Sequence, residues 1–306
     1  MASRQSTEEA IAKLVVDVHG LDIKENELGR GAYGVVLGVT VNGKECIAKK
    51  LHLSLPRESS PGVESYQFRK FREECVTLSG LRHPNLVEFI GIHYGADRND
   101  ISLIMERLHI DLADFAEKNP NTSTTIHVHI FQDIANGLVY LHSLDPPLIH
   151  RDLTAPNILL TKDLKAKIGD LGVSRYIDPK SIAKLTNVPG NHNYMPPEAK
   201  QEEPTYTTKL DVFSFGNIII HTLTGKVPSL FDLPLDAATV ELAKQGKCEL
   251  KKRKKSVEEI PQGHCLYGLM VECLHDNPDH RPTAQQLRDT LSQLQQQQQQ
   301  PLNKVG

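Results

Sequence analysis

The chain has 306 residues, which is enough for one large domain or two of moderate size. Its 35 Lys and Arg nearly balance its 38 Asp and Glu, so no overall field points to a nucleic acid or an anionic membrane. The five cysteines form no C-x-x-C pair, and the most apolar stretch, 218–223, is far shorter than the ~20 residues that span a bilayer. We therefore expect a cytoplasmic protein with no nucleic-acid partner and no membrane insertion.

The pattern of apolar residues changes from β-like to helical near residue 108. Ser6-Thr7-Glu8-Glu9 resembles the start of a helix, which we expect to continue to about Val18. Asn42-Gly43 lies between two β-like runs and predicts a tight hairpin turn. The expected strands are 35–41, 44–51, 86–94 and 101–105, and the expected helices are 68–81, 126–142, 210–223, 237–245, 266–275 and 283–293.

A glycine-rich segment, Gly29-Arg30-Gly31-Ala32-Tyr33-Gly34, has the spacing G-x-G-x-x-G. Glycines let backbone N–H groups close over phosphates where a Cβ would collide. The predicted hairpin that follows excludes a dinucleotide-binding oxidoreductase, whose motif of the same spacing opens a helix. The segment predicts a loop over the phosphates of a nucleotide.

The strongest pattern is His150-Arg151-Asp152-Leu153, with Asn157 five residues after Asp152. Asp152 can accept the proton of an attacking hydroxyl, and Asn157 can reach Mg²⁺. Asp170, in Asp170-Leu171-Gly172, supplies the anionic oxygen that Mg²⁺ prefers. Together with the glycine-rich segment, these motifs closely resemble those of the eukaryotic protein kinase family. The resemblance extends over about 23–294 and is nearest to the tyrosine-kinase-like branch of that family.

The resemblance implies an α+β fold of two lobes, a small β-rich N-lobe with one main helix and a larger helical C-lobe. The expected divisions are an N-terminal helical extension (1–22), a kinase domain (23–294) and a Gln-rich disordered tail (295–306). Within the kinase domain we expect an N-lobe at about 23–105, a hinge at 106–108 and a C-lobe at about 109–294.

Two adjacent lysines compete for the role of the lysine that holds the α/β-phosphates in this family. An Ala two positions before the lysine selects Lys50, which then shares a strand face with Ala48. A two-residue turn at Asn42-Gly43 instead puts Lys49 opposite Val36. Both alternatives stay open. The resemblance assigns the partner of this lysine to Glu74 of the expected helix 68–81.

The resemblance also implies the ligands and the remaining site residues. We expect ATP and Mg²⁺ as cofactors, a protein substrate, Asp152 as the catalytic acid–base residue, and Asn157 and Asp170 as metal ligands. Met105 is the expected gatekeeper beside the hinge. The expected ATP-binding residues are Leu28, Gly29, Arg30, Gly31, Ala32, Tyr33, Gly34, Val36, Ala48, Lys50, Met105, Glu106, Leu108 and Leu159.

Two positions depart from the pattern of Ser/Thr kinases. Thr154 stands where they carry Lys, and Asn191 stands where they carry Thr. A hydrogen bond between Thr154 and Asn191 would orient Asp152 without a positive charge. We expect a protein kinase of Ser/Thr rather than Tyr specificity, and the alternative is a nucleotide-binding pseudokinase scaffold.

Later motifs suggest an ion pair and a regulatory site. Glu198 follows a segment that resembles the end of the activation loop, and Arg281 is its expected partner. Arg151 precedes Asp152, so an upstream kinase that phosphorylates the activation loop is a further hypothesis. The candidate hydroxyls are Ser174, Tyr176, Ser181 and Thr186.

Overall fold

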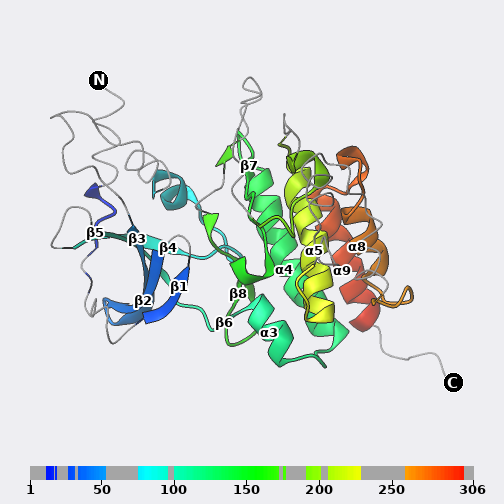
Figure 1. Ribbon diagram of the computed structural model, residues 1–306, viewed down its shortest axis with the longest axis horizontal. Helices are drawn as coiled ribbons and strands as arrows, with labels where there is room; N and C mark the ends of the chain where they lie inside the picture. Colours follow the sequence, from blue (N-terminus) through cyan, green and yellow to red (C-terminus); the bar gives the residue numbers. More distant parts are fainter. Residues whose placement is uncertain are drawn as a thin grey trace, which may run out of the picture. The chain divides into compact units, whose positions relative to one another are not determined.

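The chain folds into two compact units, residues 1–108 and 109–306. The first is built on a β-sheet and the second mainly on helices (Figure 1), so the expected α+β class is confirmed. The computed structural model describes residues 12–16, 18, 27–31, 34–52, 75–95, 100–171, 175–176, 191–200, 206–228 and 259–299.

A five-stranded antiparallel sheet forms the first unit. Asn42 and Gly43 have φ angles of 50° and 78°, as a two-residue turn between antiparallel strands requires. This predicted turn is confirmed, and it pairs Val41 with Lys44 and therefore Val36 with Lys49. The strands are β1 (Glu27–Gly31), β2 (Gly34–Val41), β3 (Lys44–His52), β4 (Phe89–Tyr94) and β5 (Asp100–Glu106), in the order β1-β2-β3-β5-β4.

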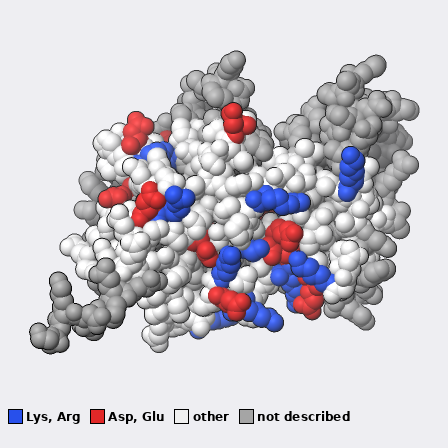
Figure 2. All heavy atoms as spheres, turned by 180° about the vertical axis from the view of Figure 1, so that it is seen from behind, with Lys and Arg blue, Asp and Glu red and all other residues white. Residues whose placement is uncertain are grey.

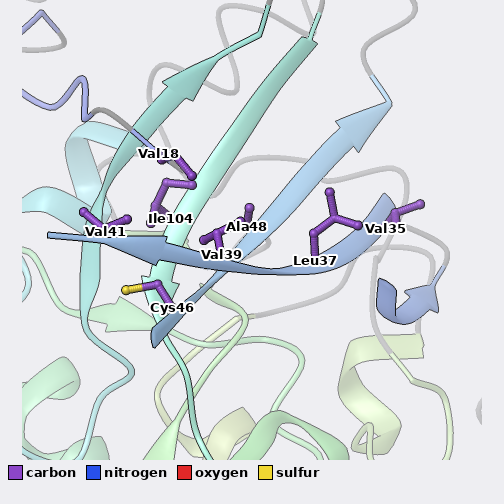
Figure 3. Close-up of a cluster of buried hydrophobic side chains, with 8 residues drawn as sticks. All are labelled: Val18, Val35, Leu37, Val39, Val41, Cys46, Ala48 and Ile104. Carbon is purple, nitrogen blue, oxygen red and sulfur yellow. The ribbon is translucent and has the colours of Figure 1, made fainter. Parts of the chain in front are cut away.

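Buried aliphatic side chains cover one face of this sheet (Figure 3). Because successive side chains of a strand point to opposite faces, alternate residues of β2 and β3 contribute to it. Val18 of the N-terminal segment packs against the same cluster and is 8% exposed. The members are Val18, Val35, Leu37, Val39, Val41, Cys46, Ala48 and Ile104.

Residues 14–16 run beside β4, the edge strand of the sheet. The backbone N–H of Val16 donates to Ile92 O (2.9 Å), and the N–H of Ile92 donates to Leu14 O (2.7 Å). Val15 forms a parallel bridge with Ile92. The prediction that a helix continues to Val18 is therefore wrong here, because β-branched residues beside an open sheet edge gain hydrogen bonds by extending. Residues 1–11 lie outside the described part.

The rest of the first unit agrees with the expected elements where it is described. The two predicted strands before the hinge are confirmed as β4 and β5. Residues 75–80 are helical, as expected for the second half of the helix 68–81. The first half, which includes Glu74, lies outside the described residues.

Long helices form the frame of the second unit (Figure 1). Four of the five expected helices are confirmed there: α4 (Thr124–His142), α5 (Lys209–Thr224), α8 (Tyr267–Cys273) and α9 (Ala284–Gln299). The fifth, 237–245, lies outside the described residues. Helix α4 packs against α9, and α5 packs against α8. Every residue from 210 to 222 is buried, so α5 is the central helix of this unit.

Two helical features differ from the expectation. The short helix α3 (Leu112–Lys118) was not predicted, although Asp111 caps it by accepting the N–H of Asp114 (2.9 Å). Helix α9 continues to Gln299, beyond the expected end of this helix at residue 293. Glutamine is a good helix former, and Gln298 Nε2 lies 3.8 Å from Cys265 Sγ.

Short strands and 3₁₀ turns hold the motif residues of the second unit. Strand β7 (Leu148–Ile149) pairs with β10 (Arg175–Tyr176), and β8 pairs with both β6 and β9. The remaining elements are β6 (Ile110–Asp111), β8 (Ile158–Leu160), β9 (Ala166–Ile168), η1 (Ala155–Asn157), η3 (Pro197–Lys200) and η5 (Pro278–His280).

The surface charge and the apolar character of the helices can be compared with the expectations from the sequence. Acidic and basic side chains are interspersed on the face drawn in Figure 2, as the nearly balanced charge predicts. Among the described residues, no helix has both the length and the apolar character that crossing a bilayer requires.

Candidate active site

One buried carboxylate, that of Asp211, binds the backbone of the segment 150–157, which contains Asp152 and Asn157 and is called the catalytic segment below. Asp211, at the start of α5, accepts the backbone N–H groups of His150 (3.0 Å) and Arg151 (3.1 Å). His142 Nε2 donates to the same carboxylate at 2.8 Å. Asp211 is fully buried, so these donors replace the water that its charge would otherwise need.

Asp152 is partly exposed, and its carboxylate is oriented by two neutral donors. Asn157 Nδ2 donates to Asp152 Oδ2 (3.2 Å) and to the Asp152 carbonyl oxygen (2.8 Å). The backbone N–H of Asn191 donates to Asp152 Oδ1 (2.9 Å). Each carboxylate oxygen can accept two hydrogen bonds, so Asp152 keeps capacity for an incoming hydroxyl.

Asp170 lies directly after the β8–β9 hairpin. The N–H of Gly169 donates to the carbonyl oxygen of Asn157 (2.8 Å), which brings the two expected metal-binding segments together. His150 Nδ1 accepts the N–H of Asp152 (3.3 Å), so its Nε2 carries the proton and donates to Gly169 O (2.7 Å). Asp170 has a φ angle of 51°, a left-handed conformation that is uncommon outside glycine and recurs at active sites.

The donor set of this segment fits a magnesium ion. The amide nitrogen of Asn157 is directed at Asp152, so its Oδ1 is left as the ligand atom. Asp170 adds a carboxylate, and hard cations such as Mg²⁺ take oxygen ligands of these kinds. Mg²⁺ also keeps several waters and binds substrate phosphates, so two protein ligands suffice.

The segment 191–198 connects Asp152 to helix α5. Tyr194 O accepts hydrogen bonds from Ser214 Oγ (3.1 Å) and Asn217 Nδ2 (3.2 Å), both on α5. The side-chain oxygen of Asn191 accepts the N–H of Asn193 (3.0 Å) rather than a donor from Thr154. The expected contact between Thr154 and Asn191 is therefore corrected, since Asn191 orients Asp152 through its backbone.

The ion pair expected between Glu198 and Arg281 is confirmed. Arg281 Nη1 and Nη2 donate to the two oxygens of Glu198 at 2.5 and 2.9 Å. Arg281 is 2% exposed, and its other donors bind the carbonyl oxygens of His275, Lys209 and Asp276. This two-pronged hydrogen-bonded ion pair links η3 to the segment 275–281 of the second unit.

The first unit separates the two candidate lysines by strand register. Lys49 lies opposite Val36 and Leu103, and two residues earlier on β3 Ile47 lies opposite Met105, so these side chains share one face. Lys50 and Ala48 belong to the other face, which carries the buried cluster with Val18. The expected ATP-binding residues Val36, Ala48 and Lys50 are therefore divided between the two faces of the sheet, with Val36 on the face of Lys49.

The other expected nucleotide contacts are distributed over both units. Gly31 pairs with Gly34 across the tip of the β1–β2 hairpin, whereas Ala32 and Tyr33 lie outside the described residues. The hinge residue Glu106 is held by Glu88, whose carbonyl accepts its N–H (3.0 Å). Leu28 is exposed in the first unit, and Leu159 is partly buried on β8 in the second.

Sequence reasoning missed two residues that the structure brings to the catalytic segment. Asp211 lies near the start of the helix predicted at 210–223, but that prediction does not reveal its hydrogen bonds to His150 and Arg151. The available signal was a charged residue inside an otherwise apolar helix, because a buried charge needs partners. His142, whose side chain also donates to Asp211, carries no comparable signal.

Comparison with known proteins agrees with this geometry. A family model described as "Protein kinase domain" matches residues 23–291. The "Probable serine/threonine-protein kinase roco6" of Dictyostelium discoideum is 32% identical over 280 residues, which cover 87% of this chain and 12% of that protein. The "Probable serine/threonine-protein kinase roco11" of the same organism is 29% identical over 285 residues, which cover 89% of this chain and 18% of that protein.

A plant protein gives a similar match. The "LRR receptor-like serine/threonine-protein kinase RGI1" of Arabidopsis thaliana is 29% identical over 285 residues, which cover 90% of this chain and 25% of that protein. The chain thus spans between 12% and 25% of the lengths of these three relatives. The family match covers most of the sequence, and the motifs occur in it in the expected order. The chain belongs to the protein kinase family, nearest to its tyrosine-kinase-like branch.

Proposed function

We propose that this chain is an active protein kinase that transfers the γ-phosphoryl group of ATP to Ser or Thr hydroxyls of a protein. The observation that carries the proposal is the orientation of Asp152 by Asn157 and Asn191. A carboxylate held in this way, and still partly exposed, suits a residue that accepts the proton of the attacking hydroxyl. The relatives named above as serine/threonine-protein kinases support the choice of hydroxyl.

In this proposal the chain's own residues divide the work. Asp152 receives the hydroxyl proton, and Asn157 keeps its carboxylate in position while its Oδ1 serves as a metal ligand. Asp170 supplies the anionic ligand. Bound Mg²⁺ would neutralise charge on the phosphates. The hydrogen bonds that Asp152 accepts from Asn157 and Asn191 do not favour the pseudokinase alternative.

For the phosphate-binding lysine we propose Lys49 rather than Lys50. Lys49 shares its sheet face with the expected gatekeeper Met105 and with Val36. Glu74, its expected partner, lies outside the described residues. With Lys49 in this role, the residue two positions earlier is Ile47, which is bulkier than the Ala of the common motif.

Two further proposals concern regulation and location. Arg151 is 4% exposed, with its guanidinium 5.2 Å from the centre of the Tyr206 ring. Of the four candidate phosphorylation sites, Tyr176 lies on β10, and Ser174, Ser181 and Thr186 lie outside the described residues. We keep phosphorylation of this loop by an upstream kinase, and a cytoplasmic location, as proposals.

The test is incubation of the purified chain with labelled ATP, Mg²⁺ and generic protein substrates, followed by phosphoamino-acid analysis. We expect phosphoserine or phosphothreonine, and loss of the signal in Asp152→Asn. Asp163→Asn is the matched control, since Asp163 is an exposed carboxylate in the loop between β8 and β9. The proposal would be overturned if the wild type transferred no phosphate, or if Asp152→Asn transferred it at the wild-type rate.

A further inference from the structure

A buried hydrogen bond joins the segment 191–198 to the far end of α5. The hydroxyl group of Tyr194 is hydrogen-bonded to Nδ1 of His221, and the two side chains are 2% and 5% exposed. Their ring centres are 6.2 Å apart. His221 lies ten residues after Asp211 on the same helix, about 15 Å along its axis.

The protonation states of this pair follow from burial. Burial raises the pKa of the Tyr194 phenol above its ordinary value, so the hydroxyl keeps its proton. Burial lowers the pKa of His221, so its ring is neutral near pH 7. Tyr194 therefore donates, and Nδ1 of His221 accepts.

Two successive hydrogen bonds connect Tyr194 to the carboxylate of Asp152. The backbone N–H of Tyr194 donates to Asn191 O (3.0 Å), and the N–H of Asn191 donates to Asp152 Oδ1 (2.9 Å). Tyr194 thus connects, through Asn191, to the donor on Oδ1 of Asp152.

We propose that His221 is a positioning residue for phosphoryl transfer: by accepting the Tyr194 hydroxyl it fixes the segment 191–198 and, through Asn191, the orientation of Asp152. The inference rests on the proposed kinase function. Both ends of helix α5 then help to orient the carboxylate of Asp152. Near the first end, Asp211 binds the backbone of residues 150 and 151, and near the last end, His221 binds Tyr194 of the segment 191–198.

The variants separate hydrogen bonding from packing. His221→Leu fills the buried site with an apolar side chain that cannot accept a hydrogen bond from Tyr194. His221→Asn offers a neutral acceptor close to the position of Nδ1. Tyr194→Phe removes the donor. Thr222→Val is the matched control, because Thr222 is the next buried residue of α5 and its hydroxyl has no hydrogen-bond partner among the described residues.

We expect the loss of the hydrogen bond to lower kcat without changing the KM for ATP. His221→Leu should lower kcat for peptide phosphorylation about five- to fiftyfold, with the KM for ATP unchanged. His221→Asn should restore most of this loss, and Tyr194→Phe should add little to His221→Leu in the double variant. Equal losses in the Leu and Asn variants, or additive losses in the double variant, would overturn the proposal.

A pH profile gives a readout that packing alone would not move. Burial is the one cause that lowers the pKa of His221, and among the described residues Tyr194 is the titratable group in contact with it. Protonated His221 cannot accept a hydrogen bond. Because burial lowers the pKa of His221, the ratio of wild-type kcat to that of His221→Asn should fall only at pH values below the ordinary histidine pKa of about 6.5, and titrations shared by both proteins cancel in this ratio. A ratio that stays constant down to the acid limit at which both proteins are still folded would contradict the role.

Hydrogen exchange tests the coupling even without turnover. His221→Leu should speed amide exchange at Tyr194 and Asn191, whose N–H groups form the two hydrogen bonds between Tyr194 and Asp152, whereas Thr222→Val should leave it unchanged. An inactive wild type would remove the proposed function, yet this comparison would still decide the coupling. Unchanged exchange at both amides in His221→Leu would overturn it.

Discussion

Val36 on β2 lies directly opposite Lys49 on β3. This single pairing determines the face of every residue in the hairpin, because side chains alternate along a strand. Lys50 is therefore on the face that carries Ala48 and the cluster of Figure 3.

The first prediction compares the two lysines. Lys49→Met should lower kcat/KM at least about tenfold, because it removes a charge-assisted contact to phosphate. Lys50→Met should stay close to the wild type, since its face is turned away from Val36 and Met105. Steady-state phosphorylation of a generic protein substrate measures both, with thermal unfolding as a check on folding. A normal Lys49→Met beside an inactive Lys50→Met would reverse the assignment.

Asp170→Asn should abolish transfer at ordinary Mg²⁺ concentrations, because an amide cannot supply the charge that holds the metal on the phosphates. A titration of activity against Mg²⁺ measures the effect, and Asp163→Asn serves as the control in the nearby exposed loop. Full turnover of Asp170→Asn at the wild-type Mg²⁺ optimum would exclude Asp170 as a metal ligand.

Arg281→Lys should destabilise the second unit by about 3 kcal/mol, because Lys cannot reproduce the planar fork that binds Glu198 and leaves buried acceptors unpaired. Arg288→Lys is the control: Arg288 pairs with Asp289 at 3.5 Å on the surface and should change stability by less than about 1 kcal/mol. Urea unfolding measures both variants. Equal stability of the two would mean that the buried ion pair is not a structural tie.

Gly91→Ala should loosen the N-terminal segment from β4. A Cβ at Gly91 would lie 2.4 Å from Leu14 O and 2.7 Å from Val16 Cγ1, closer than real contacts allow. The variant should lower the melting temperature and speed amide exchange at Val16 and Ile92. Gly80→Ala, which meets nothing within 4 Å, should do neither. Unchanged exchange at both amides in Gly91→Ala would contradict the packing of this segment.

The unfolding free energy should depend on pH through His127. Burial, assisted by the nearby His264, lowers the pKa of His127 to about 4. In the unfolded chain His127 takes up a proton near pH 6.5. Its contribution is therefore complete above that pH and is lost as the pH falls toward 4. His127→Leu should flatten the decline of stability in this window, whereas His129→Leu, at an exposed site of the same helix, should not. Parallel urea titrations of all three proteins decide it.

The sequence predicts the fold class and most helices because their signals are periodic and local. It fails at residues 14–16, where pairing with β4 overrides a helix-like start. It also ends α9 too early, because the Gln run has helix propensity but no apolar pattern. Both errors concern chain ends, where contacts with distant residues decide the conformation.

At the site, the motifs predict Asp152, Asn157 and Asp170 but not how they are held. The choice between Lys49 and Lys50 depended on strand register, and two local patterns gave opposite answers. The support from Asp211 and the backbone contact from Asn191 join residues that are far apart in sequence. Neither contact leaves a periodic trace that a single sequence reveals.

Four described non-glycine residues have positive φ angles, and two of them are Arg151 (70°) and Asp170 (51°) in the catalytic motifs. A left-handed backbone costs an ordinary L-residue about 1–2 kcal/mol. Glycine would remove this strain at either position but would also remove the buried side chain of Arg151 or the carboxylate of Asp170, the proposed metal ligand. Under the proposed function, selection for a more stable fold and selection for phosphoryl transfer therefore act in opposite directions at Asp170.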